Sequence, residues 1–77
     1  MLVLSTGNLT RLTMTRIHTQ KGRVLDDVYG VIIHVGSDNP PEIDLAAAFD
    51  LARRYGCNWI NFDRDAAPHP DLRSWNW

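Results

Sequence analysis

Residues 45–62 constrain the fold most, because a clear helix pattern is followed at once by a strand pattern. The apolar residues of the first part recur at helical spacing and form one stripe: Leu45, Ala48, Phe49, Ala52 and Tyr55. Gly56 follows where a left-handed helix cap is required, and Cys57 is placed for the apolar contact that often accompanies such a cap. The pattern therefore predicts a helix that stops at Gly56.

A strand is expected directly after this stop. Ile60 and Phe62 share one face of it, while Trp59 and Asn61 share the other, because side chains alternate along a strand. Asp63 is expected to end the strand. Helix and strand are thus joined by only a few residues.

Two further strands are expected upstream. Residues 2–4 form a short apolar run, and residues 28–35 form the clearest strand, rich in β-branched and aromatic side chains. Because residues 28–35 are apolar at both odd and even positions, we expect a central strand covered on one face and partly on the other. Val24 and Leu25 either begin this strand early or form an adjacent hairpin arm.

A first helix is expected after residues 5–8, whose side chains favour caps and turns. Leu9, Leu12 and Ile17 form its partial apolar stripe. Residues 38–42 hold an Asx cap, two prolines and an acid, which together predict the start of the second helix. The sequence thus predicts an α+β fold in the order β-α-β-α-β. Its three-stranded sheet would carry two helices packed on one face.

The composition bounds the class of protein. Seventy-seven residues predict a single domain over 1–77, with an extended aromatic tail from about residue 66. With one cysteine there is no internal disulfide, and no Cys/His spacing is typical of zinc. The first residues lack the features of a signal peptide, and no apolar run approaches the roughly 20 residues of a membrane helix. We expect a cytoplasmic protein without cofactor, bound metal or membrane contact.

Charge is distributed unevenly along the chain, although the formal net charge is −1. Residues 1–25 contain no acid, and their basic residues are Arg11, Arg16, Lys21 and Arg23. Such asymmetry can mark a nucleic-acid arm. No aromatic residues are interleaved with these charges, which favours solvated side chains. Nucleic-acid binding through the basic third is therefore an alternative, and direct binding is not what we expect.

Asp63 and Asp65 form the most suggestive polar pair. If the strand continued through both, the two carboxylates would lie on one face, as in Mg²⁺ or general acid–base chemistry. A small metal-dependent hydrolase is therefore an alternative function. The simpler interpretation is a turn at the strand end, with one carboxylate capping backbone N–H groups. Since two-residue motifs have low specificity, we favour the turn and assign no catalytic residue.

The end of the chain is unusual, because termini are commonly polar and frayed. Either the tail packs with Leu72 over the sheet face that carries Trp59, or its tryptophans remain exposed as anchors for a partner. We expect one tryptophan to pack and Trp77 to be the anchor. His69, between two prolines, is expected to be exposed. The candidate partner-binding residues are Asp63, Asp65, Asp71, Arg73, Trp75 and Trp77.

Both ends of the chain resemble a family of small uncharacterised proteins from plasmids, phages and integrated elements. Leu4-Ser5-Thr6-Gly7-Asn8-Leu9-Thr10 resembles that family's Leu-Ser-Thr-Ala-His-Leu-Thr opening. Residues 56–65 resemble its Gly-Cys-x-Trp-x-x-Phe-Asp-x-Asp block, and residues 72–77 echo its Leu-Pro-x-x-x-Trp tail. Asn8 replaces the family's histidine, and Arg73 replaces a proline. Any catalytic or ligand role of that histidine would be lost in this chain.

The resemblance implies a genomic setting more than a chemistry, since the family carries no established activity. Accessory genes on such elements often encode small inhibitors of host defence, including anti-CRISPR proteins. We therefore expect a protein-binding module in the bacterial cytosol whose acids and exposed aromatics cover a basic, nucleic-acid-binding surface of a host protein complex. Nothing in the sequence fixes the oligomeric state.

Overall fold

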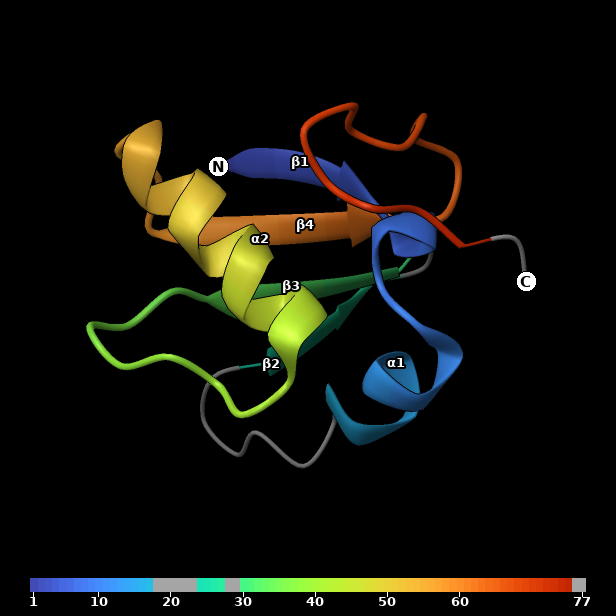
Figure 1. The fold of residues 1–77 in the computed structure, drawn as a ribbon, viewed down its shortest axis with the longest axis horizontal. Coiled ribbons are helices and arrows are strands. Elements are labelled where there is room, and N and C mark those ends of the chain that lie inside the picture. The colour runs from blue at the N-terminus through green and yellow to red at the C-terminus, as the bar shows by residue number, and fades with distance from the viewer. Residues whose placement is uncertain (18–23, 28–29, 76–77) are drawn as a thin grey trace.

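A computed structural model describes residues 1–17, 24–27 and 30–75 of the chain. It confirms an α+β fold, with helices and strands interspersed along the sequence (Figure 1). In chain order the elements are β1 (Leu2–Ser5), the 3₁₀ helix η1 (Thr6–Asn8), α1 (Arg11–Ile17), β2 (Val24–Asp27), β3 (Gly30–His34), α2 (Ile43–Arg54) and β4 (Trp59–Asp63).

The strands form one four-stranded sheet in the order β1-β4-β3-β2. β1 pairs with β4 in parallel, and the other two pairings are antiparallel. The expected count of three strands is wrong, because Val24 and Leu25 belong to a separate hairpin arm whose last residue, Asp27, pairs with Gly30. Val28 and Tyr29, which the sequence assigned to the central strand, lie outside the described residues.

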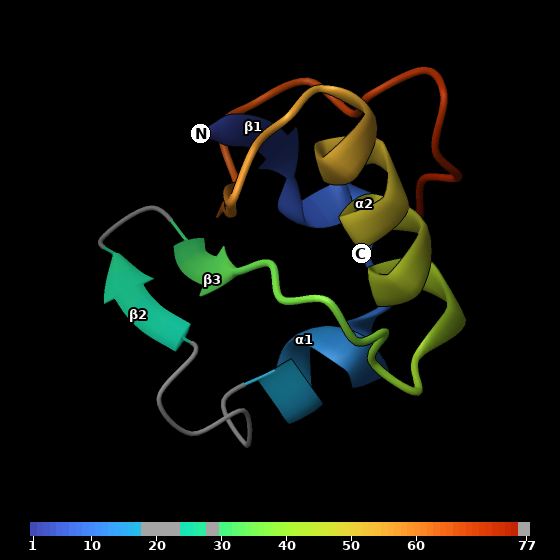
Figure 2. The ribbon, with the colours of Figure 1, turned by 90° about the vertical axis from the view of Figure 1, so that its left-hand side faces the viewer.

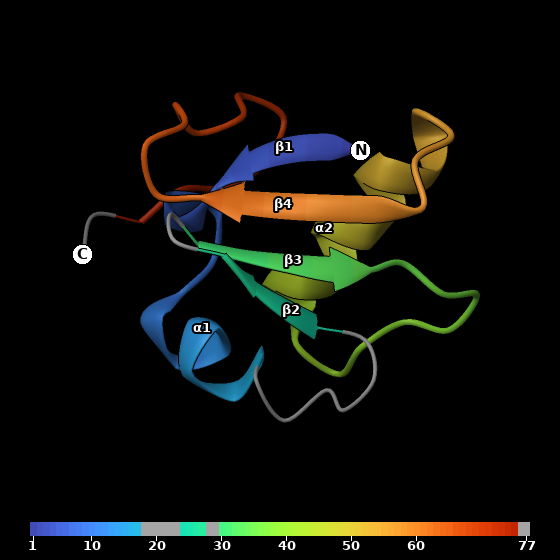
Figure 3. The ribbon, with the colours of Figure 1, turned by 180° about the vertical axis from the view of Figure 1, so that it is seen from behind.

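Both helices lie on the same side of the sheet (Figure 2). Alternate strand residues point to that side and are buried against them in one cluster, whose sheet members include Leu4, Val31, Ile33, Ile60 and Phe62. Seen from behind, the sheet has no described segment across it (Figure 3). Neither α1 nor α2 has the length and apolar content that crossing a membrane requires.

The stop of α2 is as the sequence predicts. Gly56 has φ of 68°, and its N–H donates to the carbonyl of Arg53 at 3.0 Å. The N–H of Cys57 donates to the carbonyl of Ala52 at 2.8 Å, so the helix ends in a Schellman motif. The stripe is predicted correctly except at its end, since Tyr55 is exposed and Leu51 is buried in its place.

The start of α2 differs from the prediction. Its N-cap is Glu42, which makes no side-chain capping bond, and the two prolines precede the helix. Asn39 and the backbone of Asp38 are instead bound by the guanidinium of Arg53, at 2.6 and 2.8 Å. The Asx residues therefore fix the loop before α2 and do not cap the helix.

The stripe of α1 also differs. Leu9, Thr13 and Ile17 are buried, whereas Leu12 is 59% exposed. Thr13 can lie inside because its hydroxyl donates to a carboxylate oxygen of Asp44, on α2, at 2.8 Å. A hydrogen bond from another helix thus lets a polar residue occupy the inner face, which local periodicity does not reveal.

The C-terminal tail is folded back and is not extended as predicted. The N–H of Leu72 donates to the carbonyl of His69 at 3.2 Å, which closes a turn, and Leu72 packs against the core on the α2 side of the sheet. The chain then returns to η1, where the N–H of Trp75 donates to the carbonyl of Gly7 at 2.7 Å. Trp59 lies on the opposite face, so the expected packing of the tail over Trp59 is wrong.

Candidate functional site

A largely apolar hollow lies between the first turns of α2, the start of α1 and the tail. Its volume is about 270 Å³. It is lined by Asn8, Thr10, Ile43, Asp44, Ala47, Leu72, Arg73 and Trp75. The tail thus forms one wall, and it contributes two of the candidate residues that the sequence singled out, Arg73 and Trp75.

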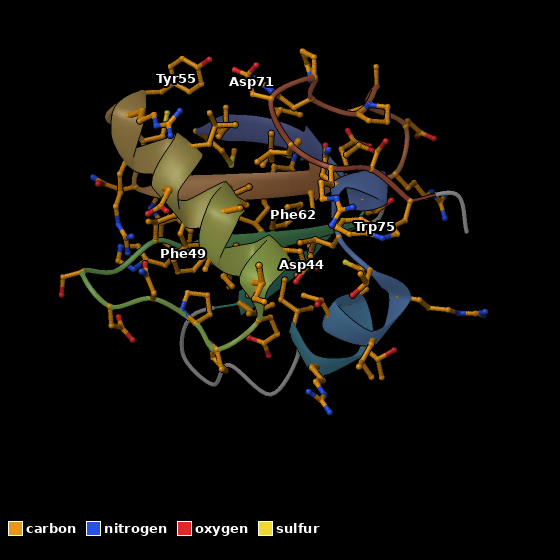
Figure 4. All side chains as sticks on the ribbon, viewed as in Figure 1. Asp44, Phe49, Tyr55, Phe62, Asp71 and Trp75 are labelled. Atoms are coloured by element: carbon orange, nitrogen blue, oxygen red, sulfur yellow. The ribbon has the colours of Figure 1, made fainter. Side chains whose placement is uncertain are left out.

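A second, smaller hollow of about 140 Å³ continues along the same helix. Its lining residues are Ala47, Asp50, Leu51, Arg54, Asp71 and Leu72. Ala47 and Leu72 line both hollows, so the two lie next to each other between α2 and residues 71–75 of the tail. We call the two adjacent hollows together the α2–tail groove. In Figure 4, Asp44 and Trp75 mark one end of the groove, and Asp71 marks the other.

The apolar end of the groove exposes large side chains. Ile43, in the first turn of α2, is 87% exposed, and Trp75 is 36% exposed. Ile43 lies outside the buried stripe of α2, so the core does not require an isoleucine there. Two large apolar side chains on opposite walls of one hollow are typical of a contact surface for another molecule.

Three polar side chains at this end, those of Asn8, Thr10 and Asp44, already have partners inside the domain. Asp44 accepts hydrogen bonds from the backbone N–H of Thr10 and from the hydroxyl of Thr13, both at 2.8 Å. Asn8, which is 1% exposed, donates to the carbonyl of Arg73 at 3.1 Å and accepts from the N–H of His69 at 2.9 Å. Because these groups are satisfied, the groove offers mainly apolar contact to a ligand.

The groove walls are held by contacts distant in sequence. Asn8 and Gly7 bind the tail from η1, and Leu72 anchors it in the core. The ring of His69 lies 6.4 Å from that of Tyr55, at the end of α2. The tail is therefore a fixed wall of the groove.

Over residues 1–77 the chain matches the family described as "Family of unknown function (DUF5983) C-terminal domain". The chain belongs to this family. No curated protein and no solved structure matches it. The DUF5983 description assigns no activity, so the function of this domain has to be inferred from its own surface.

Asp63 and Asp65 lie outside the groove of this DUF5983 domain. Oδ1 of Asp63 accepts a hydrogen bond from the N–H of Asp65 at 2.8 Å, and the carbonyl of Asp63 accepts from the N–H of Ala66 at 3.2 Å. β4 ends at Asp63, so the two carboxylates do not share a strand face and the premise of the hydrolase alternative is absent. Within the described ranges no three His, Cys, Asp or Glu side chains could hold a metal ion.

The three acids of the predicted binding surface are not brought together. Asp71 lines the groove beside Arg54, in the last turn of α2. β4 starts just after that turn, and Asp63 lies at its far end. Of these acids, only Asp71 belongs to the groove.

The basic residues of the nucleic-acid alternative are only partly described. Arg11 and Arg16 are exposed on α1. Lys21 and Arg23 lie outside the described residues, as does Trp77, the predicted anchor. Of the four residues proposed to bind nucleic acid, the structure thus describes only Arg11 and Arg16, and neither lines the groove.

A third hollow, of about 530 Å³, lies at the other end of α2 and includes His34, Arg53 and Cys57. The Cys57 thiol lies 3.8 Å from the carbonyl oxygen of Tyr55, and the His34 ring contacts that of Trp59. Arg53 is engaged by the loop that precedes α2. Among the described side chains this hollow shows no bonded nucleophile–base pair, so we assign it no chemistry.

Sequence reasoning missed the α2 wall of the groove. Ile43 and Ala47 belong to no catalytic or binding motif. A reading based on the apolar stripe of α2 assigns the residues outside that stripe to the solvent-exposed surface. Ile43 was detectable as a large apolar residue at a position outside the stripe. Asn8 was noticed only as a departure from a resembling family, and its role depends on a tail that begins some 60 residues later.

Proposed function

We propose that this domain is a protein-binding module whose partner docks in the α2–tail groove. The exposure of Ile43 beside Trp75 carries the proposal. Burying an apolar side chain fully is worth about 1.5–3 kcal/mol, so two such residues on a fixed groove can anchor a partner.

The groove favours a protein segment with one large apolar side chain. The 270 Å³ hollow between Ile43 and Trp75 receives that side chain. From Ile43 to Arg54 the helix rises about 16 Å, which corresponds to about five residues of an extended partner chain. Asp71 and Asp50 at the far end favour a basic residue there. Arg54 lines the same hollow, so this charge preference is small and the apolar contact supplies most of the affinity.

A random twelve-residue peptide library displayed on phage provides the probe, with the immobilised 77-residue chain as bait. We expect enriched peptides to share a large apolar residue followed within about five positions by Lys or Arg. A synthetic peptide of that consensus is then titrated calorimetrically. We expect Ile43→Asp and Trp75→Ala to weaken its binding at least about tenfold, since each removes an apolar contact.

Leu12→Asp is the matched control. Leu12 is also a large, exposed apolar residue near the start of a helix, and it does not line the groove. Peptide binding should be unchanged in this variant. The proposal fails if no consensus is enriched, or if Leu12→Asp weakens binding as much as Ile43→Asp does.

On the resemblance to mobile-element proteins, we further propose that the partner belongs to a host defence complex in the bacterial cytosol. Docking would cover a basic surface that the complex uses to hold nucleic acid. The test is phage plating efficiency on a host with an active defence system that expresses the chain. Expression should restore plating, and Ile43→Asp should abolish the effect while Leu12→Asp preserves it. Unchanged plating across a panel of defence systems would contradict this part of the proposal alone.

A further inference from the structure

The face of the sheet opposite the helices is uncovered in the described chain (Figure 3). We call it the open face. Its side chains follow from the strand register and the alternation along each strand: Val3, Leu25, Ile32, His34, Trp59, Asn61 and Asp63. It shares no lining residue with the α2–tail groove.

One row of the open face crosses all four strands. Val3 pairs with Asn61, Asn61 with Ile32, and Ile32 with Leu25. Val3 is 52% exposed and Leu25 is 58% exposed, at the two edges of the sheet. Three of the four residues are apolar, so the row is a strip of apolar surface in contact with solvent. Such a strip favours burial against another surface.

The polar residue of the row, Asn61, is the middle residue of β4, a central strand. Its Oδ1 has no accessible surface and no hydrogen-bond partner among the described residues. An unpaired carbonyl oxygen of this kind is destabilising. A carboxamide both donates and accepts, so two asparagines that face each other can satisfy one another. A single buried asparagine fixes register and oligomeric state in this way in coiled coils.

The two ends of the open face are complementary. At one end the rings of His34 and Trp59 contact each other, with centroids 4.8 Å apart, and each carries a ring N–H. At the other end Asp63 supplies a carboxylate, and its register partner Gly30 has no side chain. One end thus offers aromatic bulk and ring N–H donors, while the other offers a carboxylate acceptor.

We propose that the open face packs against the open face of a second copy of this chain. The two-fold axis runs along the row from Val3 to Leu25. Each residue of the row then meets its own counterpart, so the Asn61 carboxamide rotates to bond that of the second copy. The same axis reverses the strands and brings Trp59 over Asp63 of the second copy. The two sheets lie about 10 Å apart, as in aligned sheet packing.

The size of the face indicates a reversible dimer. Four strands of four or five residues span at most about 19 by 17 Å, an area on the order of 300 Å². Stable complexes commonly bury about 800 Å² on each partner. Because the face is much smaller than a standard interface, we expect the dimer to be weak and to form only at high protein concentration.

Sedimentation equilibrium of the 77-residue chain, from about 1 to about 500 µM, tests the proposal. We expect a monomer–dimer equilibrium in the wild type. Leu25→Lys should raise the dimer dissociation constant at least about tenfold, since the two-fold axis counts each substitution twice. Asn61→Asp should do the same by opposing two carboxylates at the axis. If circular dichroism shows that Leu25→Lys unfolds the edge strand β2, Val3→Lys on the other edge strand, β1, is used as the test variant instead.

Leu12→Lys is the matched control, because Leu12 is 59% exposed against 58% for Leu25 and lies on α1, away from the open face. It should leave the equilibrium unchanged. The proposal is overturned if the wild type stays monomeric at the highest concentration, or if Leu12→Lys and Leu25→Lys dissociate the dimer equally. A dimer lost in Ile43→Lys but kept in Leu25→Lys would overturn it as well, since the groove would then be the interface.

Discussion

The side chain of Asn8 and the backbone of His69 form a reciprocal pair of hydrogen bonds. The N–H of His69 donates to Oδ1 of Asn8 at 2.9 Å, and Nδ2 of Asn8 donates to the carbonyl of His69 at 3.4 Å. The same carboxamide accepts from the N–H of Ser5 and donates to the carbonyl of Arg73. One buried side chain thus fixes the tail that forms a wall of the α2–tail groove.

Replacing Asn8 should therefore loosen the tail. Asn8→Ala leaves several partly buried backbone groups unpaired, and we expect a loss of about 2–4 kcal/mol in the free energy of unfolding. Urea denaturation followed by circular dichroism measures it. Asn58→Ala is the control, since Asn58 is exposed, and it should change stability by less than about 0.5 kcal/mol. Equal effects of the two substitutions would contradict the role assigned to Asn8.

Asn8→His introduces the residue found in the family opening that this chain resembles. An imidazole has one acceptor and one donor in its neutral form, so it can replace part of the carboxamide's pattern. We expect Asn8→His to be more stable than Asn8→Ala and to keep the tail resistant to trypsin at Arg73. If both variants are cleaved there at the same rate, the histidine of the resembling proteins has another role.

Gly30 is required by the close approach of β3 to β4. A Cβ at Gly30 would overlap the carbonyl oxygen of Phe62 and lie 2.9 Å from its carbonyl carbon. Gly30→Ala should thus lower the free energy of unfolding by at least about 2 kcal/mol, because backbone atoms must move. Gly7→Ala is the matched control: its Cβ would meet the Ser5 hydroxyl at 3.2 Å, and we expect a change below about 1 kcal/mol. Thermal unfolding of both variants measures the difference, and equal losses of stability would contradict the steric role assigned to Gly30.

The elements set by local patterns were predictable from the sequence. α2, its glycine stop and β4 follow from spacing and from the conformational freedom of Gly56, which are properties of neighbouring residues. The Asp63 turn was also favoured correctly, since a carboxylate at a strand end commonly binds the next backbone N–H groups.

The features that failed depend on contacts between distant segments. Thr13 lies inside because Asp44 on another helix satisfies its hydroxyl, and Leu12 is thereby turned outward. His69 was expected to be exposed, yet it is half-buried, and its backbone N–H donates to Asn8. The groove combines a helix face with a returning tail, so no local pattern predicts that its two walls lie together.

Asp44 joins the two helices and should be the most sensitive acid among those described. Its carboxylate accepts from the N–H of Thr10 and from the hydroxyl of Thr13, both at 2.8 Å, at the N-terminal end of α1. We expect Asp44→Ala to cost about 2–3 kcal/mol, because a short helix loses a charged partner for its unpaired N–H groups. Asp50→Ala is the control on the same helix. Its exposed ion pair with Arg53 should contribute about 0.5 kcal/mol or less in urea denaturation.

Arg53 holds the loop before α2 through its planar, forked guanidinium. One terminal nitrogen donates to Oδ1 of Asn39 at 2.6 Å, and the other donates to the carbonyls of Gly36 and Asp38, each at 2.8 Å. A lysine has a single ammonium group and cannot reach both sides of the loop at once. We expect Arg53→Lys to speed amide hydrogen exchange over residues 36–39 at least about tenfold, with a loss of about 1–2 kcal/mol in local stability.

Arg54→Lys is the control for this substitution, since Arg54 is the next residue of α2 and makes none of these loop contacts. Hydrogen exchange with mass spectrometry should show no change over the loop in that variant. Protection of the loop that is equal in the two lysine variants would mean that the loop is held by the path of its backbone. In that case the hydrogen bonds of the Arg53 guanidinium would be a consequence of the loop's shape. Replacing Arg53 would then leave the conformation of residues 36–39 unchanged.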